Sequence, residues 1–213
     1  SAASTIIINK DVEAPKGKAL IVHDEPLTAF NTLTAHYYPP SVSRTSIAPS
    51  ARVAASAVIM PGCCIGENVT IGENTVLHPN VVVYANTEIG SSVVIHANST
   101  IGSDAFYFKK RADRFEPLYS CGKTVIADNV VIGSNCTIDR GVTDVSRIGK
   151  GTILDNQVHV GHDVIIGEMC LFAAQVGIAL TVTLVSVCIA FLGALAFEHE
   201  RQHGADLRLR VRR

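Results

Sequence analysis

Aliphatic residues recur every six positions over two long stretches of the chain. The first series runs through Ile47, Val53, Ile59, Ile65, Ile71, Leu77, Val83, Ile89, Ile95 and Ile101. The second runs through Ile126, Ile132 and Ile138, steps by ten to Ile148, and continues through Leu154, Val160, Ile166, Phe172 and Ile178. Small residues usually follow, with Asn, Ser or Pro nearby, which is the hexapeptide pattern of a β-helix. We therefore expect a mainly β protein in which three hexads close one triangular coil around stacked aliphatic side chains.

The first 40 residues follow a different pattern. Residues 5–9 and 19–23 have the composition of strands, and residues 26–38 place apolar side chains at helical spacing. Two strands and one helix bury too little apolar surface to fold alone. We expect residues 1–40 to be part of an α/β domain and residues 41–179 to form the β-helix.

One excursion interrupts the repeat at residues 103–124. It holds five of the twelve aromatic residues of the chain, together with the basic residues Lys109, Lys110, Arg111 and Arg114. Loops that leave a regular scaffold often carry function, so this segment is a candidate for it. The alternative is an aromatic plug that packs on a neighbouring coil.

The repeat pattern stops after residue 179. Residues 176–197 form a run of 22 residues without a charge, and five arginines follow it. Such a run is long enough to cross a bilayer as a helix, but arginines on the cytoplasmic side would place the β-helix outside the cytosol. Residues 180–213 are therefore interpreted as an irregular apolar and basic tail, either a membrane segment or an aberrant terminus.

Composition narrows the functional classes. The net charge is −1, from 18 basic and 19 acidic residues, which argues against nucleic acid as the main partner. Six cysteines show no CxxC spacing, and the N-terminal residues lack the pattern of a secretory signal. No phosphate loop, nicotinamide fingerprint or paired metal-ligand motif appears. We expect a cytoplasmic protein that uses no cofactor and no metal.

Two of the eight histidines are candidates for catalysis. His159 and His162 lie in LDNQVHVGHDVIIG, directly after the ten-residue step, with Val160 at the inward position. His162 then falls at the next turn, and we expect it to project outside the prism, where a neighbouring subunit can approach. Asp155 and Asp163 are near enough in sequence to orient an imidazole and raise its basicity. The alternative is a solvated turn histidine. We interpret His78 and His96 as lining the coil or facing another subunit.

Several motifs together resemble a known family. These are the hexad array, IGSDAFYF at 101–108, IGSNCTIDRG at 132–141, IGKGTILDNQVHVGHDVIIGE at 148–168 and CLFAAQVGIA at 170–179. They look like UDP-3-O-(3-hydroxyacyl)glucosamine N-acyltransferase, a left-handed parallel β-helix enzyme of lipid A biosynthesis. Residues 1–40 look like the end of its uridine-binding domain. The chain looks incomplete at both ends by comparison with this family.

The resemblance implies a homotrimer with active sites between adjacent prisms. The donor would be a 3-hydroxyacyl chain on acyl carrier protein and the acceptor the 2-amine of a UDP-glucosamine derivative. His162 matches the general base of the family. Substrate-binding positions are implied for Asp155, Asn156, His159, Asp104, Phe106 and Phe108.

One position departs from the family pattern. The family continues GIAG where this chain has Leu180, so an oxyanion donor would come from the backbone N–H of Leu180. Two rival functions stay open. One is another hexapeptide acyltransferase that uses acyl-CoA on a sugar nucleotide, and the other is a non-catalytic β-helix tethered by its tail. Membrane contact would then come through the tail, at the periphery of the inner membrane.

Overall fold

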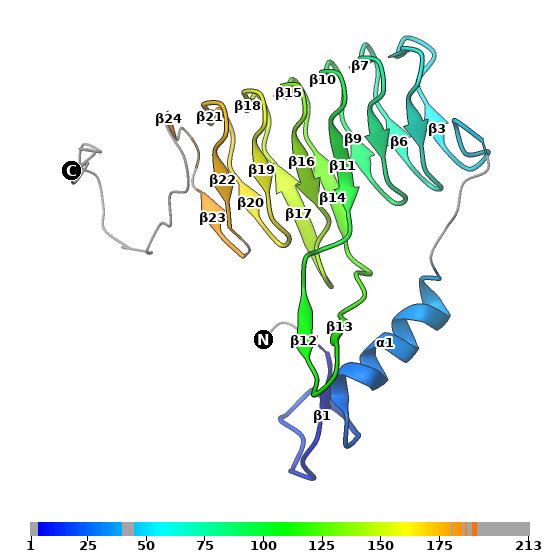
Figure 1. Cartoon of the computed structure of the whole chain (residues 1–213), viewed down its shortest axis with the longest axis vertical. Coiled ribbons are helices and arrows are strands. Elements are labelled where there is room, and N and C mark those ends of the chain that lie inside the picture. The colour runs from blue at the N-terminus through cyan, green and yellow to red at the C-terminus, as the bar shows by residue number, and fades with distance from the viewer. Residues whose placement is uncertain (1–3, 40–44, 180, 185, 187–188, 191–213) are drawn as a thin grey trace.

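The computed structural model of the chain describes residues 4–39, 45–179, 181–184, 186 and 189–190. Figure 1 shows a long solenoid, a two-stranded hairpin that leaves its middle, and a small N-terminal unit that meets the hairpin. The site described below lies where the hairpin leaves the solenoid.

The N-terminal unit consists of two strands and one helix. Strands β1 (Thr5–Ile8) and β2 (Ala19–Val22) pair in parallel, and helix α1 (Pro26–Tyr37) packs against β1. Pro26 opens the helix at a position whose backbone N–H has no intrahelical partner, so proline loses nothing there. The three predicted elements are confirmed to within a residue at each end.

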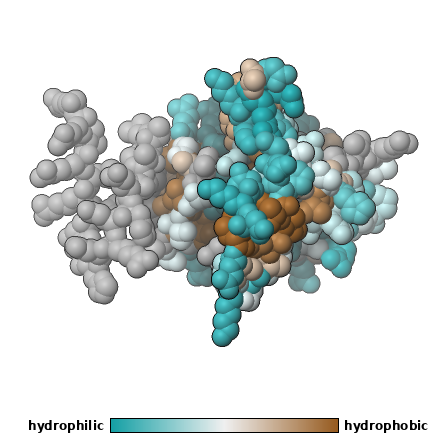
Figure 2. Space-filling view, turned by 90° about the horizontal axis from the view of Figure 1, so that it is seen from below, coloured by the Kyte–Doolittle hydropathy of each residue, from teal (hydrophilic) through white to brown (hydrophobic). Residues whose placement is uncertain are grey.

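Apolar side chains of this unit remain exposed. Figure 2 looks at the molecule from below and shows hydrophobic surface bordered by hydrophilic side chains. Ile21, Val22 and Leu33 of the N-terminal unit are among the exposed apolar residues. The unit therefore adds little to the hydrophobic core, which lies inside the solenoid.

The solenoid has three parallel sheets, here called faces 1, 2 and 3 in the order in which the chain visits them. Face 1 consists of β3 (Arg52–Val53), β6 (Thr70–Ile71), β9 (Glu88–Ile89), β14 (Lys123–Ile126), β17 (Val145–Ile148), β20 (Ile165–Ile166) and β23 (Thr183–Leu184). Face 2 consists of β4 (Val58–Ile59), β7 (Val76–Leu77), β10 (Val94–Ile95), β15 (Val131–Ile132), β18 (Ile153–Leu154), β21 (Leu171–Phe172) and β24 (Ile189–Ala190). Face 3 consists of β5 (Cys64–Ile65), β8 (Val82–Val83), β11 (Thr100–Ser103), β16 (Thr137–Asp139), β19 (His159–Val160) and β22 (Gly177–Ile178). These sheets confirm the predicted parallel β-helix.

The hexad aliphatic residues fill the interior of the solenoid. Each lies next to its equivalent in the neighbouring coil, as in the register of Ile132 with Leu154 and of Leu154 with Phe172. All three side chains are buried. A prism this narrow has room for one aliphatic layer per coil, which explains why the core uses so few large aromatic residues.

The corners of the prism require a left-handed backbone conformation. Asn occupies this position in many hexads, as at Asn68 with φ 56° and Asn98 with φ 64°. Asn tolerates positive φ better than most residues, which explains the Asn recurrence of the repeat. The amide side chains also pair between coils, and Asn68 donates to Asn86 at 3.2 Å.

The excursion at 103–124 is a hairpin rather than an irregular loop. Strands β12 (Phe108–Lys110) and β13 (Phe115–Pro117) pair in antiparallel fashion, and the chain re-enters the solenoid at β14. The segment as a whole is not an aromatic plug, because Phe106 and Phe115 are 81% and 68% exposed, although Tyr107 does lie against a coil of the solenoid at His162.

The predicted end of the repeat at residue 179 is too early. Strand β23 pairs with β20 and β24 pairs with β21, so the coil continues to residue 190. Leu184 and Ala190 keep the six-residue period after Ile178. The expected Gly and Asn are absent, yet Thr181 adopts the corner conformation with φ 58°. The inward position is thus a better guide to the coil than the corner residue.

The structure also bears on the membrane interpretation of the tail. Within the described residues, no helix is long and apolar enough to cross a bilayer. The described residues of the uncharged run 176–197 form strands of the solenoid. Residues 191–213 lie outside the described part of the chain.

Candidate functional site

His162 lies at the corner between faces 3 and 1, two residues after β19. Its side chain is only 4% exposed. The alternative of a solvated turn histidine is therefore wrong, whereas the expected approach of a neighbouring subunit to His162 stays a prediction. The corner does point the imidazole away from the aliphatic interior, but the neighbouring hairpin covers it, and the ring of Tyr107 lies 6.0 Å from its ring.

Asp163 fixes the orientation of the His162 imidazole. The distance between Nδ1 of His162 and Oδ2 of Asp163 is 2.8 Å. Asp163 is held in turn, because its backbone N–H donates to Ser146 Oγ at 2.9 Å and its carboxylate accepts the N–H of Val142 at 3.2 Å. A φ of 56° at Asp163 turns the corner where most hexads carry Asn. Asp163 is thus both the corner residue and the partner of the imidazole.

This arrangement leaves one imidazole nitrogen for chemistry. An ionised carboxylate only accepts hydrogen bonds, so Nδ1 carries the proton and Nε2 carries the lone pair. Nε2 of His162 is buried and has no hydrogen-bond partner among the described residues. A buried polar atom without a partner is rare and marks a place where a ligand atom or water is expected to bind. Nε2 is therefore positioned to accept a proton.

Asp155 does not take part in this pair. Asp155 and Asn156 lie at a different corner, between faces 2 and 3. The backbone N–H of Asn156 donates to the Asp155 side chain at 2.7 Å, and Asn156 Oδ1 accepts the N–H of Ser134 at 2.8 Å. The prediction that Asp155 orients the His162 imidazole within one chain is wrong, because strand β19 separates the two corners.

His159 lies on face 3, between those corners, and its side chain is 52% exposed. Its Nδ1 lies 2.8 Å from Thr137 Oγ1, and its Nε2 lies 3.9 Å from Asp139 Oδ2. Asp139 is itself buried and accepts a hydrogen bond from Ser103 Oγ at 2.7 Å. Burial raises the pKa of Asp139, and the Ser103 hydrogen bond and the neighbouring His159 oppose that rise.

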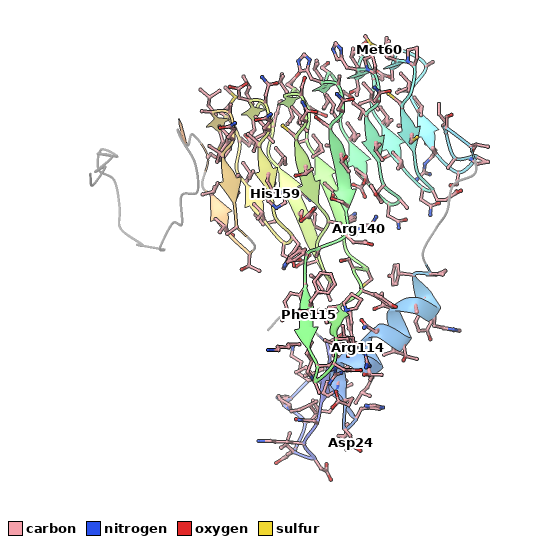
Figure 3. The ribbon with its side chains drawn as sticks, in the orientation of Figure 1. Asp24, Met60, Arg114, Phe115, Arg140 and His159 are labelled. Atoms are coloured by element: carbon pink, nitrogen blue, oxygen red, sulfur yellow. The ribbon has the colours of Figure 1, made fainter. Side chains whose placement is uncertain are left out.

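A cleft of about 1070 Å³ opens between the N-terminal unit, the hairpin and face 3. Aromatic side chains of Tyr37, Tyr84, Phe108 and Tyr119 line it, and Arg140 lies at one end. Arg140 is held by a 2.8 Å hydrogen bond from Nε to the carbonyl of Gly102. Figure 3 shows Arg140 where the hairpin joins the solenoid and His159 farther along the same side. Arg140 thus lies in the coil that precedes the one carrying His159 and His162.

Sequence reasoning did not single out Asp139 or Arg140 as site residues. Both belong to the TIDRG motif, and both lie in the coil that precedes His162. Counting one coil back from the candidate base would have found them. Tyr37 and Tyr119 carried no such signal, because their position depends on how the N-terminal unit meets the hairpin.

The expected residues of the excursion lie in different places. Asp104 and Phe108 line the cleft, and Asp104 Oδ1 lies 3.5 Å from Arg140 Nε. Phe106 packs against Phe108, with ring centroids 5.0 Å apart. Leu180, the expected oxyanion position, lies outside the described residues. Among the described residues, no group of three or more histidines, cysteines or carboxylates is suited to hold a metal.

A second, smaller groove of about 520 Å³ lies at the corner that carries Asp155 and Asn156. Its walls include the apolar side chains of Ile153 and Leu171 on face 2, and His96 lies on its rim. His96 stacks on His78 with ring centroids 4.6 Å apart. This groove offers apolar surface next to a carboxylate and an amide.

Known proteins share this architecture and much of the sequence. A model of the bacterial transferase hexapeptide (six repeats) family matches residues 44–78 and 68–103. A UDP-3-O-acylglucosamine N-acyltransferase of Neisseria meningitidis serogroup B is 36% identical over 207 residues, which cover 86% of this chain and 60% of the relative. A UDP-3-O-acylglucosamine N-acyltransferase of Anaeromyxobacter sp. strain Fw109-5 is 34% identical over 209 residues, which cover 84% of this chain and 59% of the relative. The chain is a hexapeptide-repeat protein similar to UDP-3-O-acylglucosamine N-acyltransferases.

The solved structures agree with this assignment of the fold. A UDP-N-acetylglucosamine acyltransferase of Francisella novicida aligns with a TM-score of 0.56 and 29% identity, over 64% of this chain and 55% of that protein. The sequence comparisons confirm the resemblance to UDP-3-O-acylglucosamine N-acyltransferases, and the solved structure supports the fold. The chain spans about three fifths of the length of the curated relatives it matches.

Proposed function

We propose that the protein is an N-acyltransferase of lipid A biosynthesis. It would transfer a 3-hydroxyacyl chain from acyl carrier protein to the 2-amine of a UDP-3-O-acylglucosamine. The observation that carries the proposal is the His162–Asp163 pair, which holds one imidazole nitrogen by a 2.8 Å contact and leaves the other without a partner. The names of the relatives supply the substrate class.

In this mechanism, Nε2 of His162 removes a proton from the acceptor amine as its nitrogen attacks the thioester carbonyl. The C–N bond forms, the carbonyl oxygen becomes an oxyanion, and collapse of this intermediate expels the carrier thiolate. The imidazolium then returns its proton to the thiolate. Asp163 stabilises the imidazolium, because its carboxylate faces Nδ1 at 2.8 Å. The backbone N–H of Leu180 is the proposed oxyanion donor.

The large cleft is the proposed site of the nucleotide sugar. Tyr37, Tyr84 and Tyr119 offer aromatic faces for a base or sugar, and Arg140 supplies a cation at the end nearest to the histidines. Its volume of about 1070 Å³ suits a ligand of nucleotide-sugar size. Asp104, Phe106 and Phe108 would form the wall of the cleft.

A trimer would bring the two halves of the site together. Asp155 and Asn156 lie at one corner of the prism and His162 at another, so we propose that the cleft joins corners of adjacent subunits. The outward residues of face 2 are aliphatic in successive coils: Val58, Val76, Val94, Val131, Ile153 and Leu171. An aliphatic stripe of this length favours association with other copies.

The test is an acyl-transfer assay with two donors. The chain is incubated with UDP-3-O-acylglucosamine and either 3-hydroxyacyl carrier protein or 3-hydroxyacyl-CoA. We expect transfer from the carrier protein, and a loss of about 10²–10⁴-fold in His162→Ala, the usual contribution of a general base. His23→Gln, at a histidine of the N-terminal unit that lines neither groove, is the matched control.

Each outcome of that assay decides between the functions. A coenzyme A donor that outperforms carrier protein would favour another hexapeptide acyltransferase. Absence of transfer from both donors would favour a non-catalytic β-helix. Unchanged turnover in His162→Ala would remove the proposed base. We also propose a cytoplasmic location with peripheral contact at the inner membrane, which fractionation of cells tests.

A further inference from the structure

An aromatic side chain of the excursion lies against the candidate base. The ring of Tyr107 meets the His162 imidazole edge to face, with centroids 6.0 Å apart and planes inclined by 67°. Tyr107 comes from the stem of the hairpin, the two segments 104–107 and 117–122 that connect the hairpin to the solenoid. It lies 55 positions before His162 in the sequence. Its hydroxyl makes no hydrogen bond within the described part of the chain. The contact is therefore one of packing.

The same contact explains a contradiction in the site. A base must reach its substrate, yet the His162 side chain is 4% exposed and its Nε2 is buried without a partner. In this arrangement, Nε2 has almost no surface that an acceptor amine could contact. Some group over the imidazole has to move before a proton can be transferred.

Tyr107 is the group best suited to move. The residue is 44% exposed, so it already faces solvent in part. The opposite side of the imidazole is fixed, because Asp163 is held by Ser146 and by the backbone of Val142.

The stem of the hairpin holds Tyr107 in place through its backbone. The N–H of Leu118 donates to the Tyr107 carbonyl at 2.9 Å, and the N–H of Ala105 donates to Ser120 Oγ at 3.1 Å. Helix α1 binds the same stem through Asn31. Its side-chain amide donates to the carbonyl of Pro117 at 2.8 Å and accepts the N–H of Tyr119 at 2.9 Å. The N-terminal unit therefore determines where Tyr107 lies.

A second contact joins the N-terminal unit to the outer part of the hairpin. Glu25 lies 2.6 Å from Arg111 and 3.4 Å from Lys109, and Arg111 also contacts Glu116 at 2.5 Å. The hydrogen bond from Arg111 lowers the pKa of Glu25, so this junction stays paired at neutral pH. The hairpin is thus fastened to the N-terminal unit at both its stem and its strands.

We propose that Tyr107 is a positioning residue that packs on the His162 imidazole and controls access to its Nε2. A role for this access control in catalysis rests on the proposed function. The physical claim, that Tyr107 shields Nε2, does not depend on it. A ligand that displaces Tyr107 gains contact with the base, and Tyr107 otherwise keeps the imidazole facing Asp163.

Chemical modification of histidines tests the claim without any acyl substrate. Diethyl pyrocarbonate transfers an ethoxycarbonyl group to an accessible neutral imidazole nitrogen, and peptide mass spectrometry then resolves each histidine. His159, with its side chain 52% exposed, is the internal reference. We expect His162 to react at least about tenfold more slowly than His159 in the native protein, as for a site that reacts through local opening.

The variants separate shielding from a change in folding. We expect Tyr107→Ala to raise the rate at His162 about tenfold and to leave His159 unchanged, since local opening no longer limits the reaction. Tyr107→Phe keeps the ring and should react like the native protein. Phe115→Ala, at the exposed end of the hairpin, is the matched aromatic control and should also react like the native protein.

Two results would overturn the proposal. One is a native His162 that reacts as fast as His159, and the other is a Tyr107→Ala rate at His162 equal to that of the native protein. A parallel gain at both histidines in Tyr107→Ala would indicate general loosening and would also overturn it. Failure of the acyl-transfer assay, by contrast, would remove the proposed function and leave the shielding result standing.

Discussion

The solenoid and the hairpin are held in place by different kinds of contact. In the solenoid, a residue such as Leu154 packs on its equivalents Ile132 and Phe172 one coil away on either side. In the hairpin, Phe106 and Phe115 are exposed, and the segment is held by hydrogen bonds and ion pairs to α1 and Glu25. The first region is therefore held by a packed apolar core, whereas the second depends on a few polar contacts.

The solenoid and the hairpin contribute different parts of the candidate site. The rigid coil holds His162 and Asp163 at a fixed corner, and the loosely packed hairpin covers the imidazole with Tyr107. A scaffold that fixes the candidate base and a hairpin proposed to control access to it can be altered independently. Substitutions in the two regions should therefore differ in size and in kind.

The largest expected effect is the loss of a core side chain in the solenoid. Ile148 is fully buried in β17, in register with Ile126 on one side and Ile166 on the other. We expect Ile148→Ala to lower the free energy of unfolding by about 2–5 kcal/mol, because the cavity spans two coil contacts. Urea denaturation followed by circular dichroism measures the change.

The hairpin supplies the control for that variant. Phe115 is 68% exposed, and we expect Phe115→Ala to change the free energy of unfolding by less than about 0.5 kcal/mol. Equal losses in the two variants would contradict the division between a packed solenoid and a loosely held hairpin.

The second effect comes from coils that approach each other closely at a corner. A Cβ added at Gly133 would lie 2.5 Å from the backbone carbonyl carbon of Asp155 and 2.6 Å from the nitrogen of Asn156. We expect Gly133→Ala to cost about 1–3 kcal/mol of unfolding free energy, since backbone on both sides must move. The matched variant is Gly177→Ala, where no atom lies within 4 Å of the added carbon.

Thermal unfolding of both variants sharpens the comparison. Gly177→Ala should be neutral or gain about 0.5–1 kcal/mol, because alanine restricts the unfolded chain more than glycine. A loss in Gly177→Ala as large as in Gly133→Ala would mean that contact between coils is not the cause.

The solenoid was predictable from sequence because its contacts are periodic. Apart from the excursion and one ten-residue step, the inward residues from Ile47 to Ile178 recur every six positions, so the pattern determined the strands and marked His162 as a corner residue. Leu184 and Ala190 were missed because the prediction relied on Gly and Asn at the corners, where Thr181 also fits. The inward aliphatic position is the physical requirement, and the corner residue is only a preference.

The cover over His162 was not predictable in the same way. The contact of Asn31 with Tyr119 joins residues 88 positions apart, and no repeat or motif connects them. Asp155 and Asp163 were equally good candidates for the imidazole partner until the coil placed them at different corners. Sequence patterns singled out His162 as the candidate base, and only three-dimensional packing shows that its imidazole is buried.

The third effect is local and lies at the junction of α1 with the hairpin. Asn31→Ala removes both hydrogen bonds to the stem, each worth about 0.5–1.5 kcal/mol in net stability. We expect faster hydrogen exchange at the amide of Tyr119 and faster tryptic cleavage at Arg111 and Arg114. Amides of the buried solenoid, such as that of Ile132, should exchange at the native rate.

Hydrogen exchange measured by mass spectrometry decides this prediction. Exchange that speeds up equally in the hairpin and in the solenoid would show that the two regions unfold as one unit. Exchange confined to residues 103–124 would support a hairpin that opens by itself.

The smallest effect is a pH dependence at the point where the solenoid meets the excursion. Asp139 is buried beneath Ser103, and burial raises its pKa above the value of an unfolded chain. The native state therefore binds the Asp139 proton more tightly than the unfolded state does, and stability from this group falls as pH rises through that range. Asp139→Asn cannot ionise, and its amide oxygen can still accept from Ser103. We expect Asp139→Asn to be more stable than the native protein at neutral pH, with the difference shrinking as the solution is acidified below the ordinary pKa of aspartate. Melting temperatures measured across this pH range test the prediction, and the exposed Asp113→Asn is the control for net charge. A stability difference that grows on acidification would contradict it. That result would show that His159 and His162 stabilise Asp139 as a carboxylate more than burial destabilises it.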